Sequence, residues 1–285
     1  MGNANNTPRG DVGGIMLLDL AKLTLNITSD SLALRLVASL ASRTQRPPMD
    51  QAQRAAISQA QAIRYGEQAT HTAWCWGEGP LVLLVHGWNG RAAQMAPLAR
   101  QIAARGYRTV APDITGHGDS PGTRTQWHFF RRDLLQLVND LDQGIHTLIG
   151  HSAGALAMMA ARHAGEIRAS RYTCICAPSH PFPPIEVIRR KLAPRPAVIS
   201  SYQRLIAEQL GASWEDMQAG TLYRGLNEKT LLIYDQDDRI VNHSEGDRLV
   251  GLSPSAQLMK TQGYGHNRIL AAPEVMEALN RFVDL

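Results

Sequence analysis

The 285-residue chain has little cysteine, and three cysteines are too few for a framework of disulfide bonds. Cys174 and Cys176 are separated by one residue inside an apolar stretch, so on a β-strand their side chains would point to opposite faces of the sheet and could not pair. An odd number of cysteines without such a framework fits a reducing compartment, and we therefore expect a cytoplasmic protein.

The chain also lacks a long uninterrupted hydrophobic run. Residues 1–14 are polar and rich in Gly and Asn, without the basic start and apolar core of a secretory signal, and we expect them to be disordered. The apolar segment that follows, residues 15–41, contains four charged residues, which exclude a membrane-spanning helix. These residues are Asp19, Lys22, Asp30 and Arg35. The spacing instead predicts two short amphipathic helices, Ile15–Leu25 and Ser31–Ser42.

The charges exclude nucleic acid as a partner. The formal net charge is +4, but the basic residues are scattered, and no run of Lys and Arg is interleaved with aromatic residues as a nucleic-acid surface requires. The densest basic cluster, Arg189-Arg190-Lys191, favours a solvated helix face over a contact with an anionic ligand or a phospholipid. The N-terminal helices are expected to pack against the main domain or a partner in a homodimer, with a lipid surface as the alternative.

What the sequence does contain is an alternation of apolar β-like runs and longer helical patterns, after a Gln/Ala-rich helix expected at Asp50–Ile63. With 44% hydrophobic and 19% charged residues, the composition is that of a globular α/β protein. The alternation predicts a mostly parallel central sheet with helices on both faces, one of them at Thr125–Leu141. The expected strands are Thr70–Trp76, Leu81–His86, Arg108–Pro112, His146–Ile149, Tyr172–Ala177, Thr230–Tyr234 and Ala256–Thr261.

One interval interrupts this alternation. Between His180 and Glu228 no strand is expected, and the segment opens with three prolines that cannot continue a strand. We interpret residues 180–229 as an inserted helical cap on a core formed by residues 70–179 and 230–285. Residues 1–69 would then form an N-terminal extension.

The pentapeptide Gly150-His151-Ser152-Ala153-Gly154 lies between an expected strand and an alanine-rich expected helix. In this position Gly-x-Ser-x-Gly is typical of a nucleophile elbow, a tight turn that holds the serine in a strained backbone conformation above the edge of a sheet. A serine hydroxyl is a weak nucleophile at neutral pH, so Ser152 requires a histidine base and a carboxylate that orients this base.

Three acids compete for the role of the carboxylate. Asp235, Asp237 and Asp238 all follow the expected strand Thr230–Tyr234. We favour Asp238, because it lies a few residues beyond the strand and just before an apolar pair of residues. Turn formation and helix capping are the alternative roles for the other two.

The base is predicted to be His266. It follows the last expected strand on a glycine-rich loop, in the chain order serine, acid, histidine. His243 is also downstream, but it is too close to Asp238 in sequence to reach back to it. The oxyanion of the intermediate needs two backbone N–H donors, which we assign to Ala153, directly after the serine, and to Trp88, in the glycine-rich turn after an earlier strand.

Together these motifs resemble the α/β-hydrolase superfamily over residues 74–285, and in particular a bacterial branch of serine esterases and lipases. The resemblance rests on Val85-His86-Gly87-Trp88, the turn Asp113–Ser120, the elbow, Asp238 and Gly265-His266. It implies that Gly116-His117-Gly118-Asp119-Ser120 is a structural loop, so we assign no catalysis to His117 or Asp119. It also argues against dehalogenase and epoxide hydrolase activity, because those superfamily members have an aspartate at the position of Ser152.

The expected reaction is transfer of an acyl group to water through an acyl-enzyme, with neither a metal nor an organic cofactor. No His/Cys spacing typical of a metal site occurs in the sequence. We expect a carboxylic ester hydrolase for small to medium apolar acyl groups, since the cap is modest in size and rich in aliphatic residues. Lipase, thioesterase and carbon–carbon hydrolase activities use the same residues, as does a cofactor-free haloperoxidase side activity. A non-catalytic binding protein of the hydrolase fold is the alternative from another class.

Overall fold

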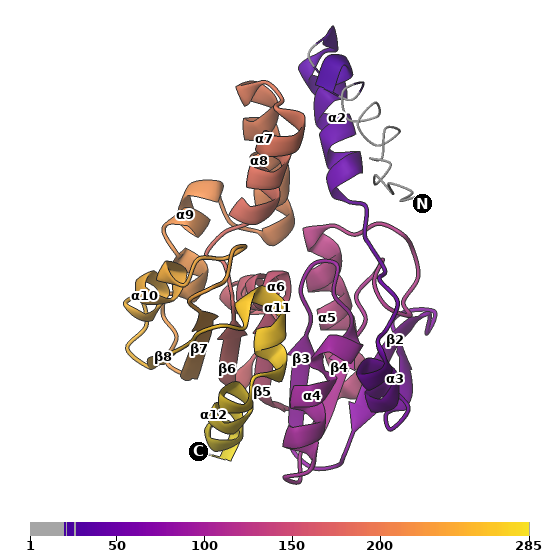
Figure 1. The fold of residues 1–285 in the computed structure, drawn as a ribbon, viewed down its shortest axis with the longest axis vertical. Helices are drawn as coiled ribbons and strands as arrows, with labels where there is room; N and C mark the ends of the chain where they lie inside the picture. Colours follow the sequence, from indigo (N-terminus) through magenta and orange to yellow (C-terminus); the bar gives the residue numbers. More distant parts are fainter. Residues whose placement is uncertain (1–19, 21, 26, 285) are drawn as a thin grey trace, which may run out of the picture. The chain divides into compact units, whose positions relative to one another are not determined.

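The computed structural model describes residue 20, residues 22–25 and residues 27–284. Its centre is an eight-stranded sheet with the strand order β1-β2-β4-β3-β5-β6-β7-β8 (Figure 1). β2 runs antiparallel to both of its neighbours, and the other neighbouring strands are parallel, which confirms the expected fold class. The strands are β1 (Gln61–Tyr65), β2 (His71–Trp76), β3 (Leu81–Val85), β4 (Arg108–Pro112), β5 (Ile145–His151), β6 (Ala169–Ile175), β7 (Lys229–Asp235) and β8 (Ala256–Thr261).

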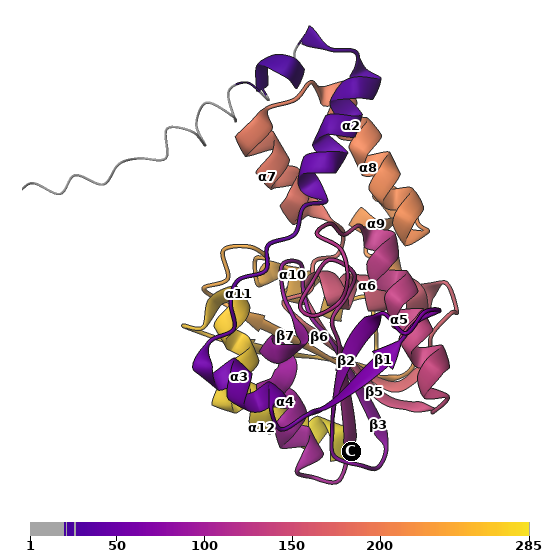
Figure 2. The same cartoon turned by 90° about the vertical axis from the view of Figure 1, so that its right-hand side faces the viewer.

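Helices cover both faces of this sheet (Figures 1 and 2). β3 consists of five aliphatic residues that are all buried, as expected of a parallel strand covered on both sides. α4 (Ala92–Ala103) and α12 (Pro273–Asp284) pack together on one face, and α5 (Trp127–Leu141) and α6 (Ala153–His163) on the other. The sheet is also flanked by α3 (Gln51–Ile57), α9 (Trp214–Gln218), α10 (Ser244–Val250), α11 (Gly265–Arg268) and the 3-10 turns η1 (Thr221–Tyr223) and η2 (Ile269–Ala271).

The first strand is one that the sequence analysis does not predict. The helix expected over Asp50–Ile63 is shorter: α3 begins after a capping box between Asp50 and Gln53 and ends at Ile57. β1 follows it and pairs with β2 at the edge of the sheet. Only Tyr65 of its five residues is buried, so β1 shows neither the apolar run nor the alternation that identifies the other strands.

The chain divides into two compact units, and this division differs from the expected one. The larger unit comprises residues 42–183 and 204–285 and contains the sheet. The smaller unit comprises residues 1–41 and 184–203. The interval expected to form one cap, residues 180–229, is therefore shared between the two units. Residues 42–69 belong to the sheet unit, where the Thr44 hydroxyl and the Arg46 guanidinium both donate to the carbonyl oxygen of Gly116.

The described part of the smaller unit contains α2 (Asp30–Ala41), most of α7 (Phe182–Leu192) and the first half of α8 (Pro196–Leu210). α2 corresponds to the helix expected at Ser31–Ser42. The disordered start expected for residues 1–14 lies outside the described residues, as does most of the helix expected at Ile15–Leu25, of which residues 20 and 22–25 are described and helical. In the described ranges, no helix combines the length and the apolar character needed to cross a bilayer.

Candidate active site

Ser152 lies on a sharp turn between a strand and a helix. β5 ends at His151, α6 begins at Ala153, and Ser152 between them has φ +52° and ψ −118°. A positive φ is strained for a residue with a side chain, and strain of this kind is frequent at functional sites. The backbone therefore has the conformation predicted for a nucleophile elbow.

The two glycines of the pentapeptide allow the chain to make this turn. A Cβ atom at Gly150 would lie 2.5 Å from the Cα atom of Ala155. A Cβ atom at Gly154 would lie 2.4 Å from the carbonyl oxygen of His86. Only glycine fits at these two positions, because α6 passes so close to β5 and to the loop after β3.

The structure brings the serine, the histidine and the acid of the prediction together. His266 Nε2 lies 2.9 Å from Ser152 Oγ, and His266 Nδ1 lies 2.7 Å from Asp238 Oδ2. The three side chains follow the carboxyl ends of β5, β7 and β8, which lie near one another in the sheet. A carboxylate at Nδ1 keeps the imidazole proton on that nitrogen, so Nε2 is free to accept the proton of Ser152.

Asp238 is held as a carboxylate although its side chain is fully buried. Its second oxygen, Oδ1, accepts the backbone N–H groups of Ile240 at 2.7 Å and Val241 at 3.0 Å. Burial raises the pKa of Asp238, but the hydrogen bond and charge of His266 and the two N–H groups lower it by more, so that the net pKa is below its ordinary value. Ile240 and Val241 are the apolar pair that favoured Asp238 in the sequence analysis, and they hold its carboxylate through their main-chain N–H groups.

The two competing acids support the loop that carries His266. Asp235 lies at the end of β7 and accepts four hydrogen bonds. Three of them come from the end of β8 and from the loop after it, which carries His266. Burial raises the pKa of Asp235, but these bonds lower it by more. Asp237 accepts the N–H of Gly263 at 2.9 Å. The donors to Asp235 are the Thr261 hydroxyl at 2.7 Å and the N–H groups of Gly265 at 2.9 Å, Asp237 at 3.0 Å and Tyr264 at 3.2 Å.

The two predicted oxyanion donors lie next to Ser152. Ala153 is the first residue of α6, so its N–H has no acceptor within the helix. Trp88 follows β3 and lines the same pocket as Ser152. Within the part of the chain that the structure describes, neither N–H donates a hydrogen bond. Both are therefore available to an anionic oxygen formed beside Ser152.

Two buried histidines hold the loop that contains Trp88. His86 Nε2 accepts the N–H of Ile114 at 3.1 Å, and His117 Nε2 accepts the N–H of Asn89 at 3.0 Å. Burial lowers the pKa of His86, and burial also lowers the pKa of His117, to about 2. Both rings are therefore neutral acceptors at neutral pH, which agrees with the structural role expected for the loop of His117.

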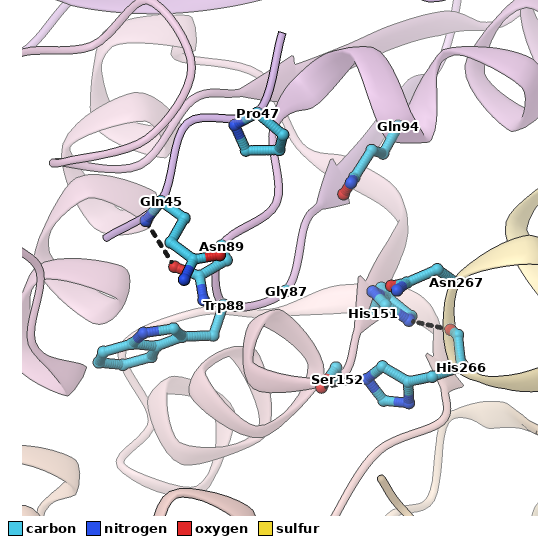
Figure 3. A pocket seen from close by; sticks show the side chains of 10 residues that line it. All are labelled: Gln45, Pro47, Gly87, Trp88, Asn89, Gln94, His151, Ser152, His266 and Asn267. Atoms are coloured by element: carbon cyan, nitrogen blue, oxygen red, sulfur yellow. Dashed lines mark hydrogen bonds between the residues drawn. The ribbon is translucent and has the colours of Figure 1, made fainter. Parts of the chain in front are cut away.

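A pocket of about 200 Å³ opens beside Ser152 (Figure 3). Four of its residues carry side-chain amides, and none of its residues is a lysine, arginine, aspartate or glutamate. The amide groups of Gln45, Gln94 and Asn267 make no hydrogen bond to any other described residue. The lining residues are Gln45, Pro47, Gly87, Trp88, Asn89, Gln94, His151, Ser152, His266 and Asn267.

His151 is a residue of the site whose role the sequence analysis missed. Its Nε2–H donates to the main-chain oxygen of His266 at 2.8 Å and so ties the histidine loop to the elbow. Burial, followed by the charge of His266, lowers the pKa of His151 to about 3, so the ring is neutral at neutral pH. The pattern Gly-x-Ser-x-Gly carries no signal for this role, because any residue satisfies its second position.

One group of side chains in the described ranges has the composition of a metal site: the ligand atoms of His151, Cys176 and His266 lie within 4.8 Å of one another. The two ring nitrogens of His266 are, however, already bonded to Asp238 and Ser152. Burial also raises the pKa of the Cys176 thiol well above its ordinary value, which disfavours the thiolate that a metal requires. The arrangement fits serine chemistry better than metal binding.

A mostly parallel sheet covered by helices, with a serine on an elbow after a central strand, defines the α/β class of hydrolase folds. Residues 82–279, more than half of the chain, match the alpha/beta hydrolase family, and the protein belongs to that family of hydrolases.

Similar sequences cover several reactions. The chain is 38% identical over 102 residues to a non-heme chloroperoxidase from Kitasatospora aureofaciens, a match that covers 33% of this chain and 36% of that protein. It is 37% identical over 81 residues to 2-(acetamidomethylene)succinate hydrolase from Mesorhizobium japonicum, which covers 28% of this chain and 29% of the relative. The matches thus span about a third of the length of these curated relatives.

Solved structures agree with the fold. A thermophilic esterase from Thermogutta terrifontis has a TM-score of 0.58 at 21% identity, over 79% of this chain and 98% of that one. An epoxide hydrolase from Vigna radiata has a TM-score of 0.59 at 15% identity, over 80% and 98% of the two chains. At these identities the similarity shows the fold alone.

Proposed function

We propose that the protein hydrolyses carboxylic esters of small molecules through an acyl-enzyme formed on Ser152. The observation that carries this proposal is the relay from Ser152 Oγ through His266 to Asp238, with separations of 2.9 and 2.7 Å. In the first step Ser152 Oγ attacks the ester carbonyl carbon while His266 Nε2 accepts its proton, and Asp238 stabilises the resulting imidazolium. The N–H groups of Trp88 and Ala153 stabilise the oxyanion, and each such donor contributes about 3 kcal/mol.

The second step regenerates the enzyme. His266 donates its proton to the leaving alcohol as the tetrahedral intermediate collapses, which leaves the acyl group on Ser152. A water molecule then gives a proton to His266 and attacks the acyl carbon, and the carboxylic acid leaves when Ser152 recovers the proton. Thioesters react by the same steps. Epoxide opening fits less well, because the related epoxide hydrolases use an aspartate at the position of Ser152.

The pocket favours a different acyl group from the one expected from the sequence. The aliphatic cap led to an expectation of apolar acyl groups. The pocket beside Ser152 instead presents the amides of Gln45, Gln94 and Asn267, which bond to no other described residue. Its volume of about 200 Å³ lies below the roughly 300–1,000 Å³ of pockets that enclose drug-sized ligands. We therefore propose small acyl groups that carry a neutral hydrogen-bonding atom near the carbonyl.

Labelling with a fluorophosphonate tests the proposed nucleophile. The wild type should react, and Ser152→Ala should neither react nor hydrolyse p-nitrophenyl acetate above about 10⁻⁴ of the wild-type rate. Ser170→Ala, on an exposed serine, is the control that retains both properties. A wild type that is not labelled and does not hydrolyse any ester would instead indicate a binding protein of the hydrolase fold.

The polarity of the pocket has a separate test. In Gln94→Leu the ratio of kcat/KM for p-nitrophenyl methoxyacetate to that for the butyrate should fall about fivefold, the value of one hydrogen bond of about 1 kcal/mol. The intrinsic reactivities of the two esters cancel when the ratios of variant and wild type are compared. Gln101→Leu is the matched control, since Gln101 lies on α4 as Gln94 does but does not line the pocket. An unchanged ratio in Gln94→Leu would mean that the amide does not contact the acyl group.

A second reaction is favoured by the identity to a non-heme chloroperoxidase. Hydrogen peroxide could replace water in the second step and release the acyl group of the acyl-enzyme as a peracid. Peroxide-dependent oxidation of a halide in acetate buffer measures this side activity. It should disappear in Ser152→Ala, because both reactions require the same acyl-enzyme.

A further inference from the structure

The smaller unit exposes a group of large aliphatic side chains that ester hydrolysis does not use. The exposed fractions are 60% for Leu20, 58% for Leu23, 75% for Ile27 and 53% for Leu32. Leu20, Leu23 and Ile27 are spaced three and four residues apart, so they lie on one side of a helical segment. Exposed aliphatic side chains that gather in this way mark an interaction surface more often than an ordinary solvated one.

α7 of the same unit exposes basic side chains. Ile185, Ile188 and Leu192 bury one side of this helix. The opposite side carries Val187, with an exposed fraction of 41%, together with Arg190 and Lys191 of the basic cluster Arg189-Arg190-Lys191 in the last turn. All three basic residues are exposed, and within the described ranges none of them has a carboxylate partner. Val187 and the residues three and four positions later, Arg190 and Lys191, therefore share one helix face.

Arg195 brings these two features to the same end of the smaller unit. It lies in the turn between α7 and α8, four residues after Lys191. Its guanidinium donates to the Asp30 carboxylate at 2.9 Å and to the carbonyl oxygen of Thr28 at 2.6 Å. Thr28 follows the aliphatic segment directly and Asp30 is the first residue of α2, so the turn between α7 and α8 adjoins the turn after Ile27 (Figure 2).

The net positive charge of the chain is concentrated in the smaller unit. Residues 1–41 and 184–203 contain seven lysines and arginines but four aspartates and glutamates, whereas the rest of the chain contains 22 and 21. Most of the net charge of +4 thus belongs to the smaller unit. A surface with protruding aliphatic side chains beside unpaired cations is complementary to a bilayer of anionic lipids, in which apolar chains lie beneath phosphate groups.

We propose that this end of the smaller unit, formed by Leu20, Leu23, Ile27, Leu32, Val187 and the Arg189–Lys191 cluster, binds peripherally to the surface of an anionic phospholipid bilayer. The aliphatic side chains insert at the boundary between head groups and acyl chains, and the basic cluster contacts the phosphates. The inference is independent of the proposed function, since none of these residues lines the pocket beside Ser152.

Sedimentation of the full chain with vesicles tests the proposal. The wild type should bind vesicles of phosphatidylcholine with about one third phosphatidylserine, bind phosphatidylcholine alone much less, and dissociate as the salt concentration rises. Arg190→Gln/Lys191→Gln should weaken binding about 30-fold, at about fivefold for each charge near the surface. Leu23→Gln/Ile27→Gln should weaken it at least tenfold. The matched control is Arg100→Gln/Arg168→Gln, which removes two exposed charges from the larger unit.

Thermal unfolding and hydrolysis of a soluble ester establish that the variants are folded, and both should equal those of the wild type. Absence of vesicle binding by the wild type, or equal weakening in the control pair, overturns the proposal. It is also overturned if Leu23→Gln/Ile27→Gln converts a dimer in solution to a monomer without changing vesicle binding, because the aliphatic surface is then an interface between two copies of the chain.

Discussion

Replacement of Asp238 by asparagine should remove the basicity of His266 toward Ser152 while changing almost no atoms. Asp238 Oδ1 accepts two backbone N–H groups, and Oδ2 accepts His266 Nδ1–H. The asparagine oxygen must take the position of Oδ1, because an NH₂ group there would face two donors. The NH₂ group then faces His266 Nδ1 and requires that nitrogen to be an acceptor. The imidazole proton moves to Nε2, which can no longer accept the proton of Ser152.

The expected loss of kcat follows from the change in the tautomer of His266 alone. In an enzyme with the same relay, the equivalent change lowers kcat about 10⁴-fold, which corresponds to about 5.4 kcal/mol at the transition state. We expect a loss of this order in kcat for p-nitrophenyl acetate. The free energy of unfolding in urea should change much less, since the two N–H groups keep their acceptor.

The matched control is Asp237→Asn, a neighbouring acid whose hydrogen bond goes to Gly263 and not to the imidazole ring. It should retain kcat within about tenfold, because one loop hydrogen bond contributes about 1 kcal/mol. Near-normal kcat in Asp238→Asn, together with a large loss in the control or in Asp235→Asn, would falsify the assignment of the carboxylate. The reasoning about the tautomer would be refuted with it.

Two further predictions concern stability. Gly154→Ala places a methyl group 2.4 Å from the carbonyl oxygen of His86 and should lower the free energy of unfolding, measured by urea titration, by about 1–3 kcal/mol. The control is Gly144→Ala, because a Cβ atom at Gly144 has no atom within 4 Å and the residue has no positive φ. This variant should be nearly neutral in the same titration. Folding lowers the pKa of Asp235, so its hydrogen bonds stabilise the protein above the unfolded value of about 4 and lose this effect as the pH falls through the lower folded value. The Tm of the wild type should therefore fall more steeply than that of Asp235→Asn between about pH 4 and pH 2, and parallel curves would contradict the role given to this carboxylate.

Several elements were predictable from the sequence because each depends on a local pattern. The strands Arg108–Pro112 and Ala256–Thr261 have the predicted bounds. In the first of them four of the five residues are buried, as in a strand that is covered on both faces. β1 has no such pattern, because four of its five side chains are not buried at the edge of the sheet. The elbow was predictable for a related reason: glycine is required at a fixed spacing from the serine, because a Cβ atom at Gly150 or Gly154 would lie within 2.5 Å of a neighbouring segment.

The sequence by itself therefore determined the strands β2 to β8, the elbow and the order in which a serine, an acid and a histidine follow one another. Only the tertiary structure decided which of three neighbouring aspartates faces the imidazole, because their chemistry is identical and the donors around each one come from the folded loops. It also decided the polar lining of the pocket, which distant segments supply, and it placed Arg195, in the turn after α7, beside the residues that follow the aliphatic N-terminal segment. A local sequence pattern reflects the environment of one segment. These sites depend instead on the distances between segments, and only folding fixes those distances.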